Sequence, residues 1–222
     1  ILPMILGSIC VTLGSMVIGV PIGLLTAIYL AEFSSKKLYK FLKSGINLMA
    51  GIPSIVYGFF ALVVIVPFIR DIFGGTGMNI ITASILLGIM ILPTVISISE
   101  AAIRAVPKSY YEGSIALGAT HERSVFSVVL PAAKSGILSS IILAIGRAIG
   151  ETMAVILVAG NQARIPSGLT KGVRTLTTNI VIEMSYAADK HREALIATAA
   201  VLFLFILAIN SIFLIVKRRT NN

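Results

Sequence analysis

The sequence predicts an all-helical integral membrane protein whose 222 residues form one transmembrane domain, 1–222. Hydrophobic residues make up 57% of the chain and charged residues 12%, against roughly a quarter charged in soluble domains. Apolar runs of about 20 residues, the length that a helix needs to cross the hydrocarbon, recur along the chain. We therefore predict five spans, near residues 1–31, 46–69, 79–99, 135–160 and 194–216.

Apart from Arg147, the basic residues lie between and after these spans. They cluster after the first span, between the third and fourth, and at the C-terminus; the members are Lys36, Lys37, Lys40, Lys43, Arg104, Lys108, Arg123, Lys134 and Lys217. Cytoplasmic loops collect Lys and Arg, so we expect these segments, including the C-terminus, inside and loop 161–193 outside. This external loop carries five basic residues, which the charge rule does not explain. Five spans ending inside also predict a further span upstream of Ile1.

The net charge of +9 does not indicate nucleic acid as a partner, because the positive residues are spread between spans. Cys10 is the single cysteine, so no disulfide is predicted. His121 and His191 lack neighbouring ligands at metal-binding spacing, so we predict no metal site. The lipid bilayer is the partner that the composition does indicate.

Small residues and prolines mark the first three spans. Ser15, Gly19, Gly23 and Ala27 recur every four residues, and Pro21 interrupts this stripe. The second span begins with Gly51-Ile52-Pro53-Ser54, and the third contains Gly88 and Pro93. Small residues allow close helix packing in a bilayer, whereas broken helices are tolerated where they line protein or a water-filled path. The pattern leaves both interpretations open.

The fourth span carries two charges, Arg147 and Glu151. Charged groups at membrane depth are costly and usually face the interior of a helix bundle or a cavity. In a continuous helix, residues four apart lie on one face, close enough to pair. The pair either contributes to a transport pathway, together with neighbouring Thr152, or forms a structural ion pair that locks helices.

The polar segment 100–134 resembles the cytoplasmic loop of ABC importer permeases. The resemblance rests on the spacing of an acidic residue, two small residues, a glycine and a Leu-Pro pair: Glu112, Gly113, Ser114, Gly118, Val128, Leu130 and Pro131. This spacing predicts a short helix, a glycine turn and a second helix, a hairpin able to dock into a partner. The chain contains no G-x-x-x-x-G-K-[ST] phosphate loop. We therefore expect no enzyme activity and no bound cofactor here, with ATP and Mg used by separate subunits.

Three further segments resemble the permeases of phosphate importers, closer to the PstC type than to its sister PstA type. They are residues 51–60 (GIPSIVYGFF), 146–154 (GRAIGETMA) and 173–180 (VRTLTTNI). The resemblance implies a MetI-like, type I permease fold in a bacterial or archaeal inner membrane. It also implies a PstA-type sister permease, two ATP-binding subunits and an extracytoplasmic phosphate-binding protein. In that family the residues matching Arg147 and Glu151 are associated with transport.

The external loop is expected either to dock the binding protein, through Arg164, Lys171 and Arg174, or to be simply solvated. We also expect a short helix over residues 183–193. Two other functions remain open. One is import of another oxyanion, molybdate or sulfate. The other is a secondary transporter or channel that uses Arg147 and Glu151 for selectivity or proton relay, although such a protein has no use for an ATPase-docking hairpin.

Overall fold

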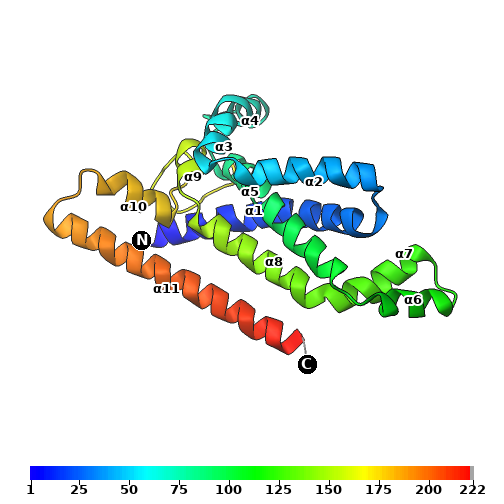
Figure 1. Ribbon diagram of the computed structural model, residues 1–222. Helices are drawn as coiled ribbons and strands as arrows, with labels where there is room; N and C mark the ends of the chain where they lie inside the picture. The colour runs from blue at the N-terminus through cyan, green and yellow to red at the C-terminus, as the bar shows by residue number, and fades with distance from the viewer. Residues whose placement is uncertain (221–222) are drawn as a thin grey trace.

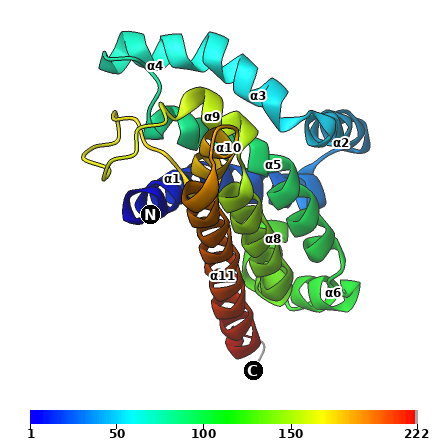
Figure 2. The same ribbon diagram turned by 90° about the vertical axis from the view of Figure 1, so that its left-hand side faces the viewer.

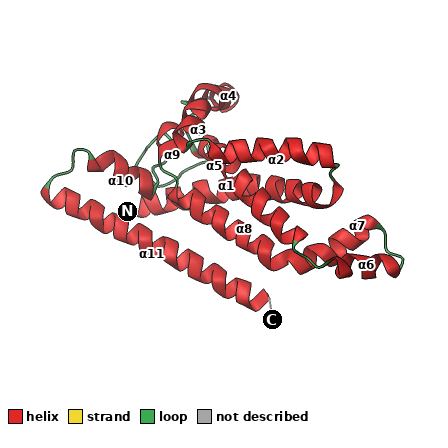
Figure 3. Cartoon of the chain, in the orientation of Figure 1, coloured by secondary structure: helices red, strands yellow, loops and turns green. Residues whose placement is uncertain are grey.

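The computed structural model describes the backbone of residues 1–220 and the side chains of residues 1–211 and 215. Every named element in this part of the chain is a helix (Figure 3). The elements, in order, are α1 (Leu2–Ile28), η1 (Tyr29–Phe33), α2 (Lys36–Gly51), α3 (Ser54–Phe60), η2 (Ala61–Ile65), α4 (Val66–Phe73), α5 (Ile80–Arg104), α6 (Lys108–Ala116), α7 (His121–Ser124), η3 (Val125–Val129), α8 (Leu130–Gly150), α9 (Met153–Val158), α10 (Leu176–Met184) and α11 (Asp189–Thr220).

Five helical stretches are long and apolar enough to cross a membrane, which confirms the expected number. They are Leu2–Phe33, Ser54–Phe73, Ile80–Arg104, His121–Gly150 and Asp189–Ser211. Two of the predicted spans are interrupted within their length. The run 46–69 is divided at Ile52-Pro53, and the run 135–160 is divided at Glu151-Thr152.

The core is built on the packing of α1 against α5. The small-residue stripe of α1 lies in this contact: Ser15 and Ala27 are fully buried. A methyl group on Gly19 would lie 2.7 Å from the carbonyl oxygen of Gly88, and one on Gly23 would lie 2.8 Å from Cγ1 of Val95. The two backbones therefore approach as closely as they do only because these positions are glycine. The packing interpretation of the stripe is confirmed.

The prolines have different effects on their helices. Pro21 and Pro93 lie inside continuous helices, so the expected interruption at Pro21 is wrong. At Pro53 the helix does end, and Ile52 adopts an extended conformation with φ −73° and ψ 127°. A proline disfavours helical dihedrals in the residue before it, and here that residue ends α2. Tyr57 spans the break, because its hydroxyl donates to the carbonyl of Met49 at 2.8 Å.

A buried charge cluster joins α1, α2 and α5. The Glu100 carboxylate is 4% exposed and accepts from Lys43 Nζ at 2.6 Å and from Arg104 Nε at 2.8 Å. Arg104 also donates through Nη2 to the carbonyl of Leu30, and its guanidinium lies over the ring of Tyr39. The cluster satisfies a carboxylate that would otherwise be costly to bury. It holds the start of α2 against the end of α5.

The basic segments gather at one end of the molecule. In Figure 1 the start of α2, the α6–α7 hairpin and the C-terminal end of α11 lie toward one end, and the N-terminus, α9 and α10 toward the other. This grouping agrees with the loop alternation expected from the charge distribution. Which end faces the cytoplasm stays a prediction. Figure 2 shows α3 and α4 following one another across the top, away from α11, which packs against α8 and α10.

Candidate functional site

The charged segment of the fourth span lies at a helix break. Helix α8 ends at Gly150, Glu151 is extended with φ −69° and ψ 131°, and α9 restarts at Met153. Glycine is a weak helix former, and Glu151 offers an alternative acceptor to the amides that follow. The continuous helix expected over 135–160 is therefore interrupted between the two residues that were expected to pair.

The carboxylate of Glu151 caps the new helix. Its Oε1 accepts from the backbone amide of Thr152 at 3.1 Å and from that of Ala154 at 3.2 Å. These amides belong to the first turn of α9, where backbone donors lack helical partners and the helix dipole favours a negative charge. Among the ion pairs of the described side chains, none joins Glu151 to Arg147. The expected pairing is wrong, because the Glu151 carboxylate is engaged by the backbone amides that follow the break.

Arg147 lies one turn before the break, on the exposed side of α8. Its Nη1 donates to Thr94 Oγ1 of α5 at 3.4 Å. Its helical neighbours Gly146 and Gly150 have open space where a side chain would be. The guanidinium thus projects from a face of α8 that the described part of this chain leaves uncovered.

The broken second span packs directly on this break. A methyl group on Gly58 in α3 would lie 2.8 Å from the Cα of Ala154 and 2.9 Å from Cδ1 of Leu157. The α3 backbone therefore rests on α9. Segment 51–60 and segment 146–154, which are about 90 residues apart in the sequence, form one contact.

The third segment completes the arrangement. Thr177 Oγ1 donates to the carbonyl of Glu151 at 3.0 Å. The start of α10 is held by a capping box between Thr175 and Thr178, and the amide of Leu176 donates to Ser8 Oγ of α1 at 3.0 Å. All three sequence segments quoted above thus meet around Glu151. Sequence reasoning did not single out Thr94 or Thr177; a hydroxyl beside Pro93 in an apolar span was the available signal for Thr94.

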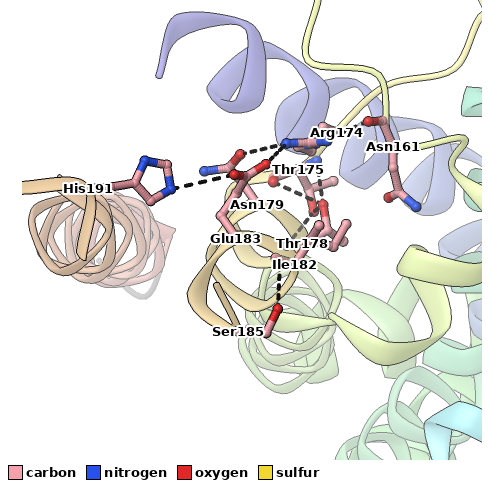
Figure 4. A network of polar contacts seen from close by, with 9 residues as sticks. All are labelled: Asn161, Arg174, Thr175, Thr178, Asn179, Ile182, Glu183, Ser185 and His191. Carbon is pink, nitrogen blue, oxygen red and sulfur yellow. Dashed lines mark hydrogen bonds and ion pairs between the residues drawn. The ribbon is translucent and has the colours of Figure 1, made fainter. Parts of the chain in front are cut away.

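Arg174, in the loop that was expected to be external, is held inside the fold (Figure 4). It donates to the carbonyl of Asn161 at 3.0 Å, to Asn179 Oδ1 at 3.2 Å and to Glu183 Oε1 at 2.6 Å, with its side chain 18% exposed. The phenol of Tyr186 and the guanidinium of Arg174 lower the pKa of the Glu183 carboxyl. Arg174 therefore orders the loop, whereas Arg164 and Lys171 are exposed.

The short external helix lies earlier than expected. It spans Leu176–Met184, and α11 begins at Asp189, so residues 183–193 contain a helix end, a turn and a helix start. Nε2 of His191 in α11 lies 3.5 Å from Oε2 of Glu183 in α10, and this contact links the two helices (Figure 4). The glycine-poor stretch after Glu183 resembled a helix locally, but the capping box fixes the helix start at Thr175.

The helix–turn–helix expected in the polar loop is present. Helix α6 ends before Gly118, whose φ of +85° is a conformation that other residues rarely adopt, and α7 begins at His121. A methyl group added to Gly113 or Gly118 would meet no atom within 4 Å. Glu112 is exposed. Ser114 accepts from Ser124 Oγ at 2.9 Å, which ties the arms together.

The second arm of the hairpin continues into the membrane. Val128 lies in η3, and Leu130 and Pro131 begin α8, so α7, η3 and α8 form one helical stretch. His121 is half-buried beside Phe33 and bonds the Tyr111 hydroxyl through Nδ1 at 2.9 Å, rather than being a plain surface residue. No cluster of three metal-ligating side chains occurs among the residues that the structure describes.

Residues 19–222 match the family described as "Binding-protein-dependent transport system inner membrane component". A probable ABC transporter permease protein, YqgH of Bacillus subtilis, is 42% identical over 84% of this chain and 60% of its own length. The phosphate transport system permease protein PstC of Xylella fastidiosa is 35% identical over 92% of this chain and 69% of its own. The chain thus spans about three fifths of the length of the first relative.

Solved structures show the same fold. One from a study of inward-facing conformations of the MetNI methionine ABC transporter has a TM-score of 0.71 at 22% identity, covering 96% of this chain and 91% of the other. An amino acid ABC transporter has a TM-score of 0.70 at 24% identity, covering 98% and 92%. The expected MetI-like all-helical fold is confirmed. The chain belongs to the family of inner-membrane components of binding-protein-dependent transport systems.

Proposed function

We propose that this chain is a permease subunit of an ATP-driven importer and forms half of the pathway for inorganic phosphate across the inner membrane. The observation that carries the proposal is the contact of the three phosphate-permease-like segments around Glu151, in a chain about a third identical to proteins named PstC. Its partners are a PstA-type sister permease, two ATP-binding subunits and an extracytoplasmic phosphate-binding protein.

Arg147 is the proposed phosphate contact. A guanidinium remains charged at all relevant pH values and its planar fork suits phosphate oxygens. It lies on an uncovered face of α8, with one 3.4 Å contact to a neutral hydroxyl and no carboxylate partner among the described side chains. Its charge is therefore available to an anion. The sister permease would cover the same face and close the pathway.

Glu151 and Thr152 shape the pathway at the break. The Glu151 carboxylate is engaged by backbone amides, which partly offsets the repulsion that it would exert on a phosphate dianion. Thr177 fixes the carbonyl of the same residue. Together these contacts hold Arg147, one turn earlier, at a defined depth.

The hairpin of α6 and α7 is the proposed coupling element. It projects at one end of the molecule (Figure 1) and exposes Leu117 at its tip, with 92% of that residue accessible. The ATP-binding subunits are its proposed partner, because the hairpin has the residue spacing that resembles the cytoplasmic loop of ABC importer permeases. ATP hydrolysis takes place in those subunits. At the other end, Arg164 and Lys171 are the proposed contacts for the binding protein, and Arg174 positions their loop.

Uptake of labelled phosphate by vesicles that contain the assembled transporter tests this function. We expect Arg147→Ala to abolish uptake and Arg192→Ala, which removes the same charge at an exposed position of α11, to retain uptake near the parent rate. Unlabelled phosphate should compete with uptake, whereas molybdate and sulfate should not. Competition by molybdate or sulfate alone would assign the importer to another oxyanion, and uptake by Arg147→Ala at the parent rate would refute the role of Arg147.

A further inference from the structure

A basic cleft opens between three helices beside the buried Glu100 cluster. It has a volume of about 360 Å³ and lies where α1 ends, α2 begins and α5 ends. Its lining residues are Ala31, Ser34, Lys36, Tyr39, Lys40 and Arg104. Nothing in the proposed transport pathway uses this cleft, because it lies at the opposite end of α5 from the loops near α9.

The cleft carries uncompensated positive charge. Lys36 and Lys40 are exposed and form no ion pair with any side chain that the structure describes. Arg104 uses Nε for Glu100 and Nη2 for the carbonyl of Leu30, which leaves Nη1 for another acceptor. Glu100 is already shared with Lys43. A further carboxylate, Glu32, lines an adjoining cleft that Arg104 also borders, and it is not among the lining residues of this one.

The surroundings of the cleft suit a lipid better than a free anion. The cleft begins where the 32-residue span Leu2–Phe33 ends, which is the depth of lipid headgroups. Leu38, Phe41 and Leu48 are exposed apolar side chains of α2, on a different side of the helix from Lys36 and Lys40. Basic pockets between membrane helices are known to bind anionic headgroups.

We propose that this cleft binds the phosphate headgroup of an anionic phospholipid. Lys36, Lys40 and the free nitrogen of Arg104 contact the phosphate. The bound lipid then holds the start of α2 against α5, next to the contact between Lys43 and Glu100.

Native mass spectrometry of the full-length chain, released from detergent with added phosphatidylglycerol or phosphatidylcholine, tests the proposal. Each lysine near an anionic surface contributes about fivefold in binding, so Lys36→Gln with Lys40→Gln should weaken phosphatidylglycerol binding about 25-fold. The control is Lys190→Gln with Arg192→Gln, which removes two exposed charges at the start of α11, far from the cleft, and should retain parent binding. Lys40→Gln alone, with about a fivefold loss, covers the case in which the double variant fails to fold.

Three results would overturn the proposal. The first is equal binding of phosphatidylcholine and phosphatidylglycerol by the parent chain. The second is an equal loss in the control variant, which would indicate a general charge effect. The third is displacement of phosphatidylglycerol by millimolar inorganic phosphate, which would assign the cleft to the free anion. Phosphate uptake by these variants, measured separately, distinguishes failure of this site from failure of the transport function.

Discussion

The packing of α3 against α9 at the candidate site can be tested directly by a single substitution. Gly58→Ala adds one methyl group at a position where it would lie 2.8 Å from the Cα of Ala154 and 2.9 Å from Cδ1 of Leu157. The leucine side chain can rotate away. The Cα of Ala154 is backbone in the first turn of α9, and it can move only if the helix moves.

The size of the effect follows from these distances. Carbon atoms pack at about 3.5–4.0 Å, so α3 and α9 must separate by roughly 1 Å. Overpacking of this kind costs about 1–3 kcal/mol, and the gain in helix propensity from glycine to alanine returns at most about 1 kcal/mol. We expect a net loss of about 1–2 kcal/mol, equivalent to a fall of about 2–8 °C in the unfolding temperature for a chain of this size.

Thermal unfolding in one detergent, followed by phosphate uptake, measures both consequences. The control is Gly45→Ala in α2, where the added methyl group meets nothing within 4 Å. We expect Gly45→Ala to unfold at or above the parent temperature and to transport normally, and Gly58→Ala to unfold earlier and transport more slowly. If Gly58→Ala matches Gly45→Ala in both measurements, α3 does not rest on α9 as described.

Three other predictions concern the cap, the hairpin and the external network. Glu151→Ala should lower the free energy of unfolding by about 1 kcal/mol, because the helix cap is lost. Glu151→Gln keeps an acceptor oxygen and should unfold near the parent temperature. Identical melting of the parent and both variants would exclude capping. Gly118→Val should strain the turn and detach or uncouple the ATP-binding subunits, because φ is +85° there; unchanged co-purification and coupled transport would contradict this. Since the Tyr186 phenol and Arg174 lower the pKa of Glu183, its stabilising contribution is present above the unfolded value of 4.5 and is lost as pH falls through the lower folded value. The melting difference between the parent and Glu183→Gln should therefore shrink as pH falls below 4.5, and growth of that difference on acidification below pH 4.5 would refute the assignment.

The membrane class, the number of spans and the hairpin could be predicted from the sequence. Burial of an apolar run in lipid depends on that run alone, so composition and length are sufficient. The hairpin turn was predictable for a similar reason, since a glycine between two short helical segments provides the left-handed conformation locally. The small-residue stripe of Ser15, Gly19 and Gly23 also marked a packing face, although it did not identify α5 as the partner.

Only the tertiary structure decided how the candidate site is arranged. Periodicity placed Arg147 and Glu151 on one face of a continuous helix, but the Glu151 carboxylate accepts hydrogen bonds from the amides of Thr152 and Ala154, and the helix ends at Glu151. The break is held by Thr177, which lies 26 residues away. Whether a helix continues or ends at such a point depends on the contacts available to its backbone, and these come from segments distant in the sequence. The sequence by itself thus pointed to Arg147, Glu151 and Thr152, whereas packing brought Thr94 and Thr177 to them.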